Sequence, residues 1–338
     1  MDLSPLVINS QGKNSNPSNK HDVSNMVAVV VTHNRKNLLS KCIDAILNQT
    51  ALCDIVVLDN ASTDGTKEFF NDGDFIGDRR SFVHYLRLKE NIGGAGGFHF
   101  GLKYAMLQRW EWFWLMDDDA VPEPDALENL LSRAEHEKTI YGSVAIGMES
   151  GKKRLCWPAE IRGRKKEQFI EYYDLLNDLN EVEGIPFLGF FIHRSIVRKI
   201  GLPNPDFFIY GDDKEYCERA KKNGVKLIIV KNSVIYHPLP DDDITFRFMH
   251  IKIIYRSLPS WKIYYNVRNK IFIGKKYYGR RLWLQTIPGI LFRAFVSLIK
   301  EKKGLSLLHV YMIAFIDGFS DLPEKTFCDI RKMDNRSR

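Results

Sequence analysis

Cysteine is scarce in this chain of 338 residues and shows no regular spacing. The five cysteines are an odd number, they lie far apart, and no C-x-x-C pair occurs among them. A disulfide framework needs paired cysteines and a structural zinc site needs closely spaced ones, so neither is expected. The pattern predicts a protein of a reducing, cytoplasmic compartment. The cysteines are Cys42, Cys53, Cys156, Cys217 and Cys328.

Long hydrophobic runs are also lacking. The first 25 residues are rich in Asn, Ser and Lys and contain no apolar core, which predicts a disordered leader (residues 1–25) and not a signal peptide. No stretch of about 20 residues is apolar throughout, as a membrane-spanning helix requires. The nearest candidate, Leu282–Ile299, is interrupted by Gln285, Pro288 and Arg293. It predicts a helix that lies on a membrane rather than crossing it.

Two common nucleotide-binding fingerprints are absent. A dinucleotide-binding fold carries G-x-G-x-x-G after its first strand, whereas this chain has THNR at positions 32–35, which argues against an NAD-dependent oxidoreductase. The glycine-rich sequence at 93–97 lacks the lysine of a phosphate-binding P-loop. A nucleotide site in this chain therefore has to be built in another way.

The net charge of +7 is unevenly distributed. From Arg247 to the end there are 19 Lys and Arg against 6 Asp and Glu, so the C-terminal part carries +13 and the remainder −6. An acidic body suits a metal site, and a basic tail suits an anionic partner such as a membrane surface or a lipid pyrophosphate. A nucleic-acid binder is disfavoured, because the positive charge gathers in an apolar segment and not in a groove with interleaved aromatics.

Apolar, β-branched runs alternate with helical patterns in the first part of the chain. Strands are predicted at 26–32, 54–59, 83–88 and 112–116, with helices at 38–47, from Ser62 to Phe70, at 97–109 and from Pro122 onward. This order predicts an α/β, Rossmann-like, mostly parallel sheet flanked by helices.

The later part of the chain is harder to assign. Residues 152–180 are predicted to be an irregular, lid-like excursion, followed by strands at 185–193, 225–230 and 234–237 and a helix at 213–222. We expect a catalytic domain over residues 26–240 and a basic, amphipathic, mainly helical C-terminal region over residues 241–338.

Polar clusters follow the predicted strands where parallel sheets place their chemistry. Asp117 and Asp119 point to the same side of the strand line, so both could meet one divalent cation, which in turn neutralises a diphosphate. The alternative is a solvated turn with acidic residues at a helix N-terminus. Asp59 ends another strand and could accept hydrogen bonds from a nucleobase or ribose, or cap the helix that follows it.

Three further groups of residues carry an open choice. The glycines at 93–97 allow a close approach of backbone to an anion, or form a flexible loop. Asp212 and Asp213 suit a general base with a raised pKa, or a helix N-terminus. His237 is a metal ligand or phosphate donor if it folds back toward the acidic cluster, and otherwise structural. Aromatic side chains that could stack on sugars, or pack in the core, are Phe190, Phe191, Phe207, Phe208 and Tyr210.

Taken together, these clusters resemble the family 2 glycosyltransferases of the GT-A fold, and within them the bacterial galactofuranosyltransferases and related rhamnosyltransferases. The resemblance covers roughly residues 26–238. The matching residues are 32–35 (THNR), 59–65 (DNASTDG), 91–98 (NIGGAGGF), 117–119 (DDD), 207–215 (FFIYGDDKE) and His237.

The resemblance implies a role for each matching position. It implies that Mn²⁺ or Mg²⁺ is held by Asp117, Asp119 and His237. It implies that Asp213 is the catalytic base and that Asp212 beside it orients the acceptor. Acceptor contacts are expected from Phe190, Phe191 and Tyr210. The nucleotide-sugar is expected to contact Thr32, Asn34, Arg35, Asp59, Asn60, Asn91, Gly93, Gly94, Gly96, Gly97 and Asp118.

The expected function is inverting transfer of a sugar, in cell-surface polysaccharide synthesis such as O-antigen or capsule. UDP-galactofuranose is the favoured donor and dTDP-rhamnose the alternative, with a glycan or polyprenyl-pyrophosphate-linked glycan as acceptor. A non-catalytic nucleotide-binding protein is the alternative from another class, but it would need neither Asp213 nor His237. The apolar C-terminal segments, next to Arg280, Arg281, Lys300, Lys302 and Lys303, are expected to dock on the inner membrane surface, to pack on the domain or to form a homodimer.

Overall fold

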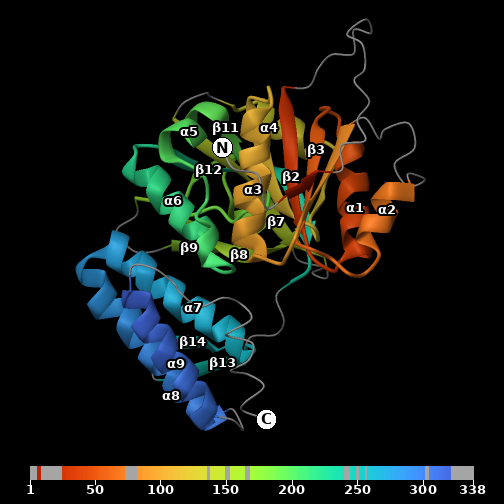
Figure 1. Cartoon of the computed structure of the whole chain (residues 1–338). Coiled ribbons are helices and arrows are strands. Elements are labelled where there is room, and N and C mark those ends of the chain that lie inside the picture. Colours follow the sequence, from red (N-terminus) through yellow and green to blue (C-terminus); the bar gives the residue numbers. More distant parts are fainter. Residues whose placement is uncertain are drawn as a thin grey trace, which may run out of the picture. The chain divides into compact units, whose positions relative to one another are not determined.

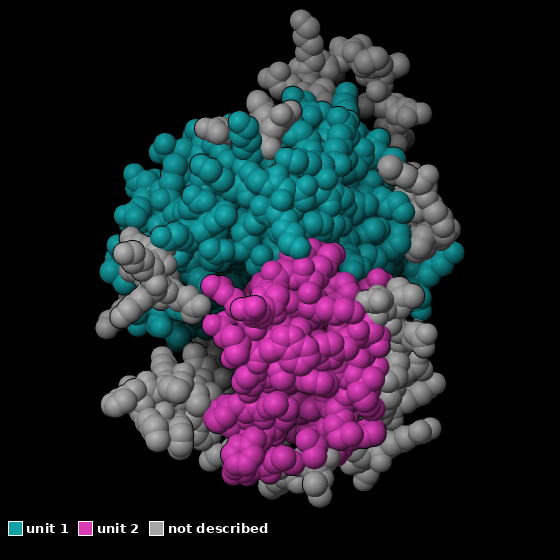
Figure 2. Space-filling model, turned by 90° about the vertical axis from the view of Figure 1, so that its left-hand side faces the viewer, with its two compact units in different colours: residues 1–205, 216–239 teal, residues 206–215, 240–338 magenta. Residues whose placement is uncertain are grey.

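The structure is a computed structural model that divides into two compact units. It describes residues 6–8, 25–72, 82–134, 138–148, 153–163, 168–239, 244–248, 251–255, 257–300 and 304–320. Unit 1 comprises residues 1–205 and 216–239, and unit 2 comprises residues 206–215 and 240–338 (Figure 2). The division at 239/240 lies next to the predicted domain boundary, but the sequence did not indicate that residues 206–215 group with the C-terminal region.

The first half of unit 1 has the predicted alternation of strands and helices (Figure 1). Four parallel strands lie in the order β4-β3-β2-β5. They are β2 (Met26–Thr32), β3 (Asp54–Asp59), β4 (Val83–Leu88) and β5 (Trp112–Asp117), and the helices between them are α1 (Lys36–Leu47), α2 (Thr66–Asp72) and α3 (Gly93–Leu107).

The second half of unit 1 makes the sheet mixed. β11 (Phe190–His193) lies antiparallel between β5 and β7 (Thr139–Gly147), and β12 (Lys226–His237) runs parallel to β7. Antiparallel additions to the sheet are β1 (Leu6–Ile8), β6 (Val121–Pro122), β8 (Arg154–Ile161), β9 (Gln168–Tyr172) and β10 (Leu179–Glu181). The remaining helices are α4 (Ala126–Leu131), α5 (Arg194–Ile200), α6 (Asp212–Lys222) and the 3-10 turns Tyr173–Leu175 and Pro205–Phe207. The α/β class is confirmed, but the sheet is parallel mainly in its first four strands.

Several predicted elements were wrong in detail. The segment 152–180 was expected to be irregular, yet it contains β8, β9 and the start of β10. The strands expected at 225–230 and 234–237 are one strand, β12, with an irregularity between Val230 and Val234. Pro122 lies in β6 and does not start a helix. Within the leader, residues 6–8 pair with β4, and otherwise residues 1–24 lie outside the described part of the chain.

Hydrophobic side chains on both faces explain the continuous apolar runs of the strands. In β2, Val27, Val29 and Val31 join a core cluster on one face, whereas Ala28 and Val30 join the cluster on the other face. A strand that is buried on both sides has no polar face, and this is the pattern expected for a central parallel strand. The rigid sheet that results fixes the loops at its carboxyl edge.

The described residues of unit 2 form helices and one hairpin. The strands β13 (Ile244–Phe248) and β14 (Ile251–Tyr255) form that hairpin, where the sequence predicted mainly helix. The helices are α7 (Ser260–Ile273), two π-helical turns (Gly274–Tyr278 and Leu282–Thr286), α8 (Ile287–Lys300) and α9 (Gly304–Phe319). Their shared core includes Tyr264, Tyr265, Ile271, Ala294 and Ala314.

The span Leu282–Ile299 keeps a large apolar surface. It is the one helix of the described residues that is long and apolar enough to cross a membrane by length and composition, and a third of it is buried in the protein. Helices inside soluble domains have the same properties, so the span is not by itself a transmembrane helix. Its exposed apolar side chains include Trp283, Leu284, Leu291, Phe295 and Ile299.

Candidate functional site

The carboxyl ends of four strands meet at one edge of the unit 1 sheet. β2, β3 and β5 are parallel; β11 is antiparallel to both β5 and β7, and β12 is parallel to β7, so β12 ends at this edge as well. Residues 32–35, 59–65, 117–120 and His237 therefore lie along the same edge. The first two loops are tied directly, because the Asn60 amide donates to the Thr32 carbonyl over 2.9 Å.

Arg35 joins two carboxylates of the loop after β5. Its Nη1 lies 3.2 Å from Asp118 Oδ1 and 2.8 Å from Asp119 Oδ2, and the Arg35 side chain keeps 51% of its surface exposed. The Thr32 hydroxyl donates to Asp118 Oδ2 over 2.7 Å. Three residues that the sequence assigned to the nucleotide, Thr32, Arg35 and Asp118, are thus brought together.

The electrostatics of the two carboxylates differ. Burial raises the pKa of Asp118 to about 6, although Thr32 and Arg35 oppose that rise. Burial also acts on Asp119, but His237 and Arg35 outweigh it and hold the pKa of Asp119 below its ordinary value. Both groups are therefore largely ionised at neutral pH, and their negative charge favours a cation beside them.

Asp119 Oδ1 and His237 Nε2 face each other, and both atoms are able to bind a metal ion. Oδ1 of Asp119 is buried and accepts no hydrogen bond from the described residues, while His237 Nε2 lies 3.2 Å away. The other ring nitrogen, Nδ1, lies 2.6 Å from the Pro238 carbonyl, and a proton on Nδ1 leaves the lone pair of Nε2 directed at a ligand. Two donors bound to one Mg²⁺-like ion at about 2.1 Å and at right angles lie about 3 Å apart, so this spacing fits neighbouring ligands of one divalent ion.

A proton on Nε2 of His237 competes with such an ion for this nitrogen. Burial lowers the pKa of His237, but Asp119 and then Cys156 outweigh it and raise the pKa to about 10. Among the described residues no group of three or more His, Cys, Asp and Glu side chains is arranged to hold a metal, and Asp117 belongs to no such group. Mg²⁺ and similar ions are commonly completed by substrate phosphates and water, so two protein ligands are compatible with the donor set.

The loops around this cluster are held in place by their own polar side chains. The side-chain amide of Asn60 donates to the Gly93 carbonyl over 3.1 Å, and the side-chain oxygen of Asn91 accepts from the Gly93 backbone amide over 2.8 Å. Asn34, which has a left-handed φ of 54°, accepts from the Thr63 amide over 2.7 Å. The backbone amide of Asn34 donates to Ser62 Oγ over 2.9 Å. Ser62 therefore stabilises this loop and does not cap helix α2, which begins at Thr66.

Asp59 is fully buried, and this corrects its expected role. One carboxylate oxygen accepts from the Ser62 amide over 2.8 Å, and the other accepts from the Tyr85 hydroxyl over 2.6 Å, with Arg87 Nε 3.4 Å away. The carboxylate thus supports the loop from inside and does not face a ligand. The sequence did not indicate Tyr85 and Arg87 as partners of Asp59, although they lie two residues apart on one face of β4.

The glycines were expected to form a loop before the helix, but they form the first turns of α3. A methyl group on Gly97 would lie 2.4 Å from Val31, and one on Gly96 would lie 2.5 Å from Ile92. Gly97 therefore lets α3 approach β2, whereas Gly96 makes room for the side chain of Ile92, the residue just before α3. Gly94 has no such neighbour, and Gly93 adopts a φ of 77° that favours glycine. The helix N-terminus itself remains at the same edge as the other loops.

Phe190 and Phe191 are core residues and not acceptor contacts. Both have no exposed surface. Phe191 stacks on Trp112 with ring centroids 4.6 Å apart, and Phe190 packs edge-on against Phe187 at 5.1 Å. Adjacent residues of a strand point to opposite faces, and both faces of this sheet are covered, so neither aromatic ring can reach a sugar.

The remaining predicted residues lie at the start of α6, in unit 2. Asp212 and Asp213 are half-buried, and burial together with the charge of Asp213 raises the pKa of Asp212 to about 7. Burial also raises the pKa of Asp213, against the pull of Lys214. Tyr210, two residues earlier, is partly exposed and has a left-handed φ of 66°. Such a carboxyl pair suits a general base.

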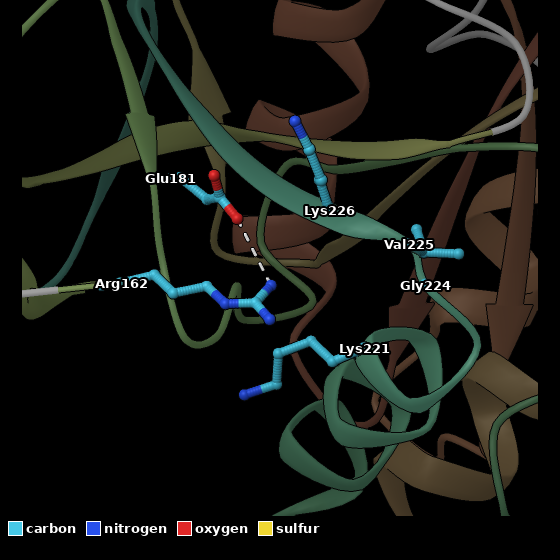
Figure 3. A pocket seen from close by; sticks show the side chains of 7 residues that line it. Arg162, Glu181, Lys221, Gly224, Val225 and Lys226 are labelled. Atoms are coloured by element: carbon cyan, nitrogen blue, oxygen red, sulfur yellow. Dashed lines mark hydrogen bonds and ion pairs between the residues drawn. The ribbon is translucent and has the colours of Figure 1, made fainter.

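A separate surface pocket lies at the opposite edge of the sheet (Figure 3). It is lined by Arg162, Gly163, Glu181, Lys221, Gly224, Val225 and Lys226. Arg162 is paired with Glu181 at 3.3 Å, and Lys226 begins β12, the strand that ends at His237. The pocket is therefore separated from the carboxylate cluster by the length of that strand.

Comparisons with known proteins show the family of the chain. The model of the family described as glycosyl transferase family 2 matches residues 27–201. The chain is 30% identical over 223 residues to "Galactofuranosyltransferase GlfT1" of Mycobacterium tuberculosis, which covers 64% of this chain and 71% of that protein. It is 23% identical over 301 residues to "dTDP-rhamnosyl transferase RfbF" of Shigella flexneri, covering 87% and 95%.

Among solved structures, the fold is similar to that of "GalNAc-T7 with UDP, GalNAc and Mn2+", with a TM-score of 0.58 at 13% identity. The match covers 94% of this chain, which spans about half (55%) of that longer chain. The fold is thus that of a GT-A glycosyltransferase. More narrowly, the chain belongs to glycosyl transferase family 2.

Proposed function

We propose that the protein is an inverting, metal-assisted glycosyltransferase that moves galactofuranose from UDP-galactofuranose to a hydroxyl group of a glycan acceptor. The observation that carries the proposal is the cluster of Arg35, Asp118, Asp119 and His237 at the carboxyl edge of the sheet, in a chain of glycosyl transferase family 2. A cation-attracting cluster at this edge suits a sugar donor that carries a diphosphate.

The donor would be held by residues of unit 1. The loop residues Asn34 and Arg35 have exposed surface for the nucleotide, and Asn91 and the N-terminus of α3 offer polar groups to the diphosphate. Thr32, Asp59 and Asn60 would act from inside by holding these loops. Mn²⁺ or Mg²⁺, held by Asp119 and His237 with Asp117 beside them, would supply charge that stabilises the departing nucleoside diphosphate.

The acceptor would be activated by Asp213. A carboxylate with a raised pKa can take the proton of the acceptor hydroxyl as its oxygen attacks the anomeric carbon from the face opposite the leaving diphosphate. One displacement of this kind inverts the configuration and needs no covalent sugar–enzyme intermediate. Asp212 and Tyr210 would orient the acceptor.

The choice of donor rests on the relatives. The protein named "Galactofuranosyltransferase GlfT1" is more similar to this chain than the protein named "dTDP-rhamnosyl transferase RfbF", at 30% against 23% identity. The latter match, however, covers more of the chain, 87% against 64%, so dTDP-rhamnose remains the alternative donor. A protein that binds a nucleotide without transfer would need no paired carboxylates at 212–213, which disfavours it.

The acceptor and the location are proposed from the chemistry of unit 2. The exposed apolar face of α8, with Arg280 and Arg281 before it, suits the inner surface of a cell membrane. A polyprenyl-pyrophosphate-linked glycan of O-antigen or capsule synthesis would be presented at that surface. A homodimer through the same apolar face is the alternative occupant.

The test is calorimetric binding of UDP, dTDP and their sugar conjugates, with and without Mn²⁺, followed by a transfer assay with the conjugate that binds. We expect Mn²⁺-dependent binding of UDP and UDP-galactofuranose. Preference for dTDP would replace the donor by dTDP-rhamnose. Binding without any transfer to glycan acceptors would favour the non-catalytic alternative, and no binding of either nucleotide would refute the proposal.

A further inference from the structure

The segment that leads into the carboxyl pair has an unusual backbone. Phe208 and Tyr210 adopt left-handed φ values of 59° and 66°, and Gly211 follows with 83°. Residues other than glycine are disfavoured in this region, and the surrounding structure has to hold them there. The residues just after this segment, Asp212 and Asp213, therefore depend on that support for their position.

Asn269 of α7 supplies the support from beneath the segment. Its side chain is buried, and Nδ2 lies 3.0, 2.9 and 2.7 Å from the carbonyl oxygens of Phe207, Ile209 and Tyr210. The two hydrogens of this amide group thus serve three carbonyl oxygens of the segment, of which that of Phe207 also accepts from the Ile209 backbone amide. The orientation of the carboxamide is fixed, because Arg268 Nε donates to Asn269 Oδ1 over 2.9 Å.

Arg268 is in turn held by its own neighbours. It is buried, its guanidinium lies 4.8 Å from the centre of the Tyr265 ring, and it also donates to the Asp206 carbonyl. The other end of the arrangement is fixed as well, because Phe208 stacks on Tyr265 with ring centroids 4.8 Å apart. Residues 264–269 of α7 (YYNVRN), for which the sequence indicated no chemistry, thus form the base on which the segment rests.

A second anchor follows the carboxyl pair by one helical turn. Glu215 is buried, and its Oε1 accepts from the Tyr277 hydroxyl over 2.6 Å and from Lys276 Nζ over 3.1 Å. The backbone is thus held on both sides of Asp212 and Asp213. We call these contacts the two anchors: the hydrogen bonds of Asn269 to residues 207–210, and those of Tyr277 and Lys276 to Glu215. The side chains that form both anchors, those of Asn269, Lys276 and Tyr277, come from the C-terminal part of unit 2.

We propose that Asn269, oriented by Arg268, is a positioning residue that holds the 207–211 segment and thereby sets the position of Asp213 for proton transfer. This inference rests on the proposed role of Asp213 as base. Asn269 itself touches no substrate. Its effect is on the chemical step and not on donor binding, because the residues proposed to hold the donor belong to unit 1.

The test compares Asn269→Ala with Asn266→Ala, a matched change at a partly exposed asparagine of the same helix. Misplacement of a reacting group by about 1 Å costs on the order of 100-fold in rate, so we expect kcat of Asn269→Ala to fall ~30- to 100-fold. The dissociation constant for UDP with Mn²⁺ should stay within about twofold of wild type. Asn266→Ala should keep both values.

The variant Asp213→Asn, alone and combined with Asn269→Ala, shows whether Asn269 affects kcat through Asp213. If Asn269 acts through Asp213, the double variant is no slower than Asp213→Asn. A folded Asn269→Ala with wild-type kcat, or losses that multiply in the double variant, would overturn the positioning role. Wild-type kcat in Asp213→Asn would instead overturn the proposed base.

A milder variant keeps the test decisive where Asn269→Ala does not fold. Tyr277→Phe removes one hydroxyl from the second anchor and no backbone support. We expect a fall in kcat of roughly threefold to tenfold with unchanged UDP binding, from a smaller misplacement of the same group. Unchanged kcat in Tyr277→Phe would count against the two-anchor arrangement.

Discussion

Replacement of Asp119 by Asn tests both the chemistry of the carboxylate cluster and its contribution to folding. The change keeps the shape of the side chain but removes the charge opposite His237 Nε2, which lies 3.2 Å from Oδ1. A metal ligand that supplies about 3 kcal/mol of charge stabilisation in the transition state corresponds to a rate factor of ~100 or more. We therefore expect at least that loss in sugar transfer, together with loss of Mn²⁺-dependent UDP binding.

The metal-free variant should also lose some stability at neutral pH. The ion pair between Asp119 and Arg35 contributes about 1 kcal/mol or less, because half of the Arg35 side chain is exposed. The contact with His237 joins two largely buried side chains, and Asp119 outweighs burial to raise the pKa of His237 to about 10, so its loss costs more. Thermal unfolding without metal should accordingly show a lower melting temperature than wild type at pH 7, where both groups are charged.

The assay is transfer activity and calorimetric UDP binding over a range of Mn²⁺ concentrations. Asp125→Asn is the matched control, because Asp125 is an exposed carboxylate just before α4. It should keep both activity and binding. Full Mn²⁺-dependent transfer by Asp119→Asn, or full activity of the wild type in EDTA, would refute the assignment of the cation to this cluster.

Three further predictions concern other parts of the site. Burial raises the pKa of the proposed base Asp213, so kcat should fall about tenfold per pH unit below an acidic limb that lies above the ordinary range of a carboxyl group; a limb at about pH 4 would contradict this. Gly97→Ala should lower the free energy of unfolding by about 1–3 kcal/mol in urea titrations, because its methyl group would lie 2.4 Å from a β2 valine, whereas Gly94→Ala should be neutral or stabilising. Equal effects of the two changes would contradict the packing role. Tyr85→Phe should cost about 1.5–3 kcal/mol of stability by removing the 2.6 Å hydrogen bond to buried Asp59, and an unchanged urea midpoint would argue against it.

The raised pKa of the carboxyl pair also has a consequence for stability, with a definite sign. A carboxyl group whose pKa is higher in the folded protein binds its proton more tightly there than in the unfolded chain. Asp212 therefore costs stability as the pH rises from about 4, its ordinary range, to about 7. Asp212→Asn should consequently raise the melting temperature at pH 8 relative to wild type, and leave it nearly unchanged at pH 4.

Much of unit 1 could be predicted from the sequence because its signals are local. A run such as Met26–Thr32 that is apolar at every position is typical of a strand buried on both faces, and a polar cluster after it indicates the carboxyl edge. The strands β2 to β5 and the loops at 32–35, 59–65 and 117–119 were located in this way. The family resemblance came from the same loops.

The tertiary structure alone decided what these residues do for one another. Sequence spacing could not show that Asp59 is enclosed by Tyr85 and Ser62, since side chains that are far apart in the chain meet only in the folded sheet. Nor could it tell that Phe191 packs on Trp112, because an aromatic ring has the same composition in a core as in a binding site.

Sequence and tertiary structure differ most in what they determine about Asp212, Asp213 and the residues that hold them in position. The sequence by itself determined that two adjacent carboxylates begin a helix. It also contains a run of aromatic and polar residues further along the chain, YYNVRN at 264–269. Only the fold brings Asn269 under residues 207–210 and Arg268 against Asn269. The physical reason is that the carbonyl groups of a bend with left-handed backbone need donors from outside a helix or sheet ladder, and the residue that supplies them is selected by proximity in space and not by order in the chain.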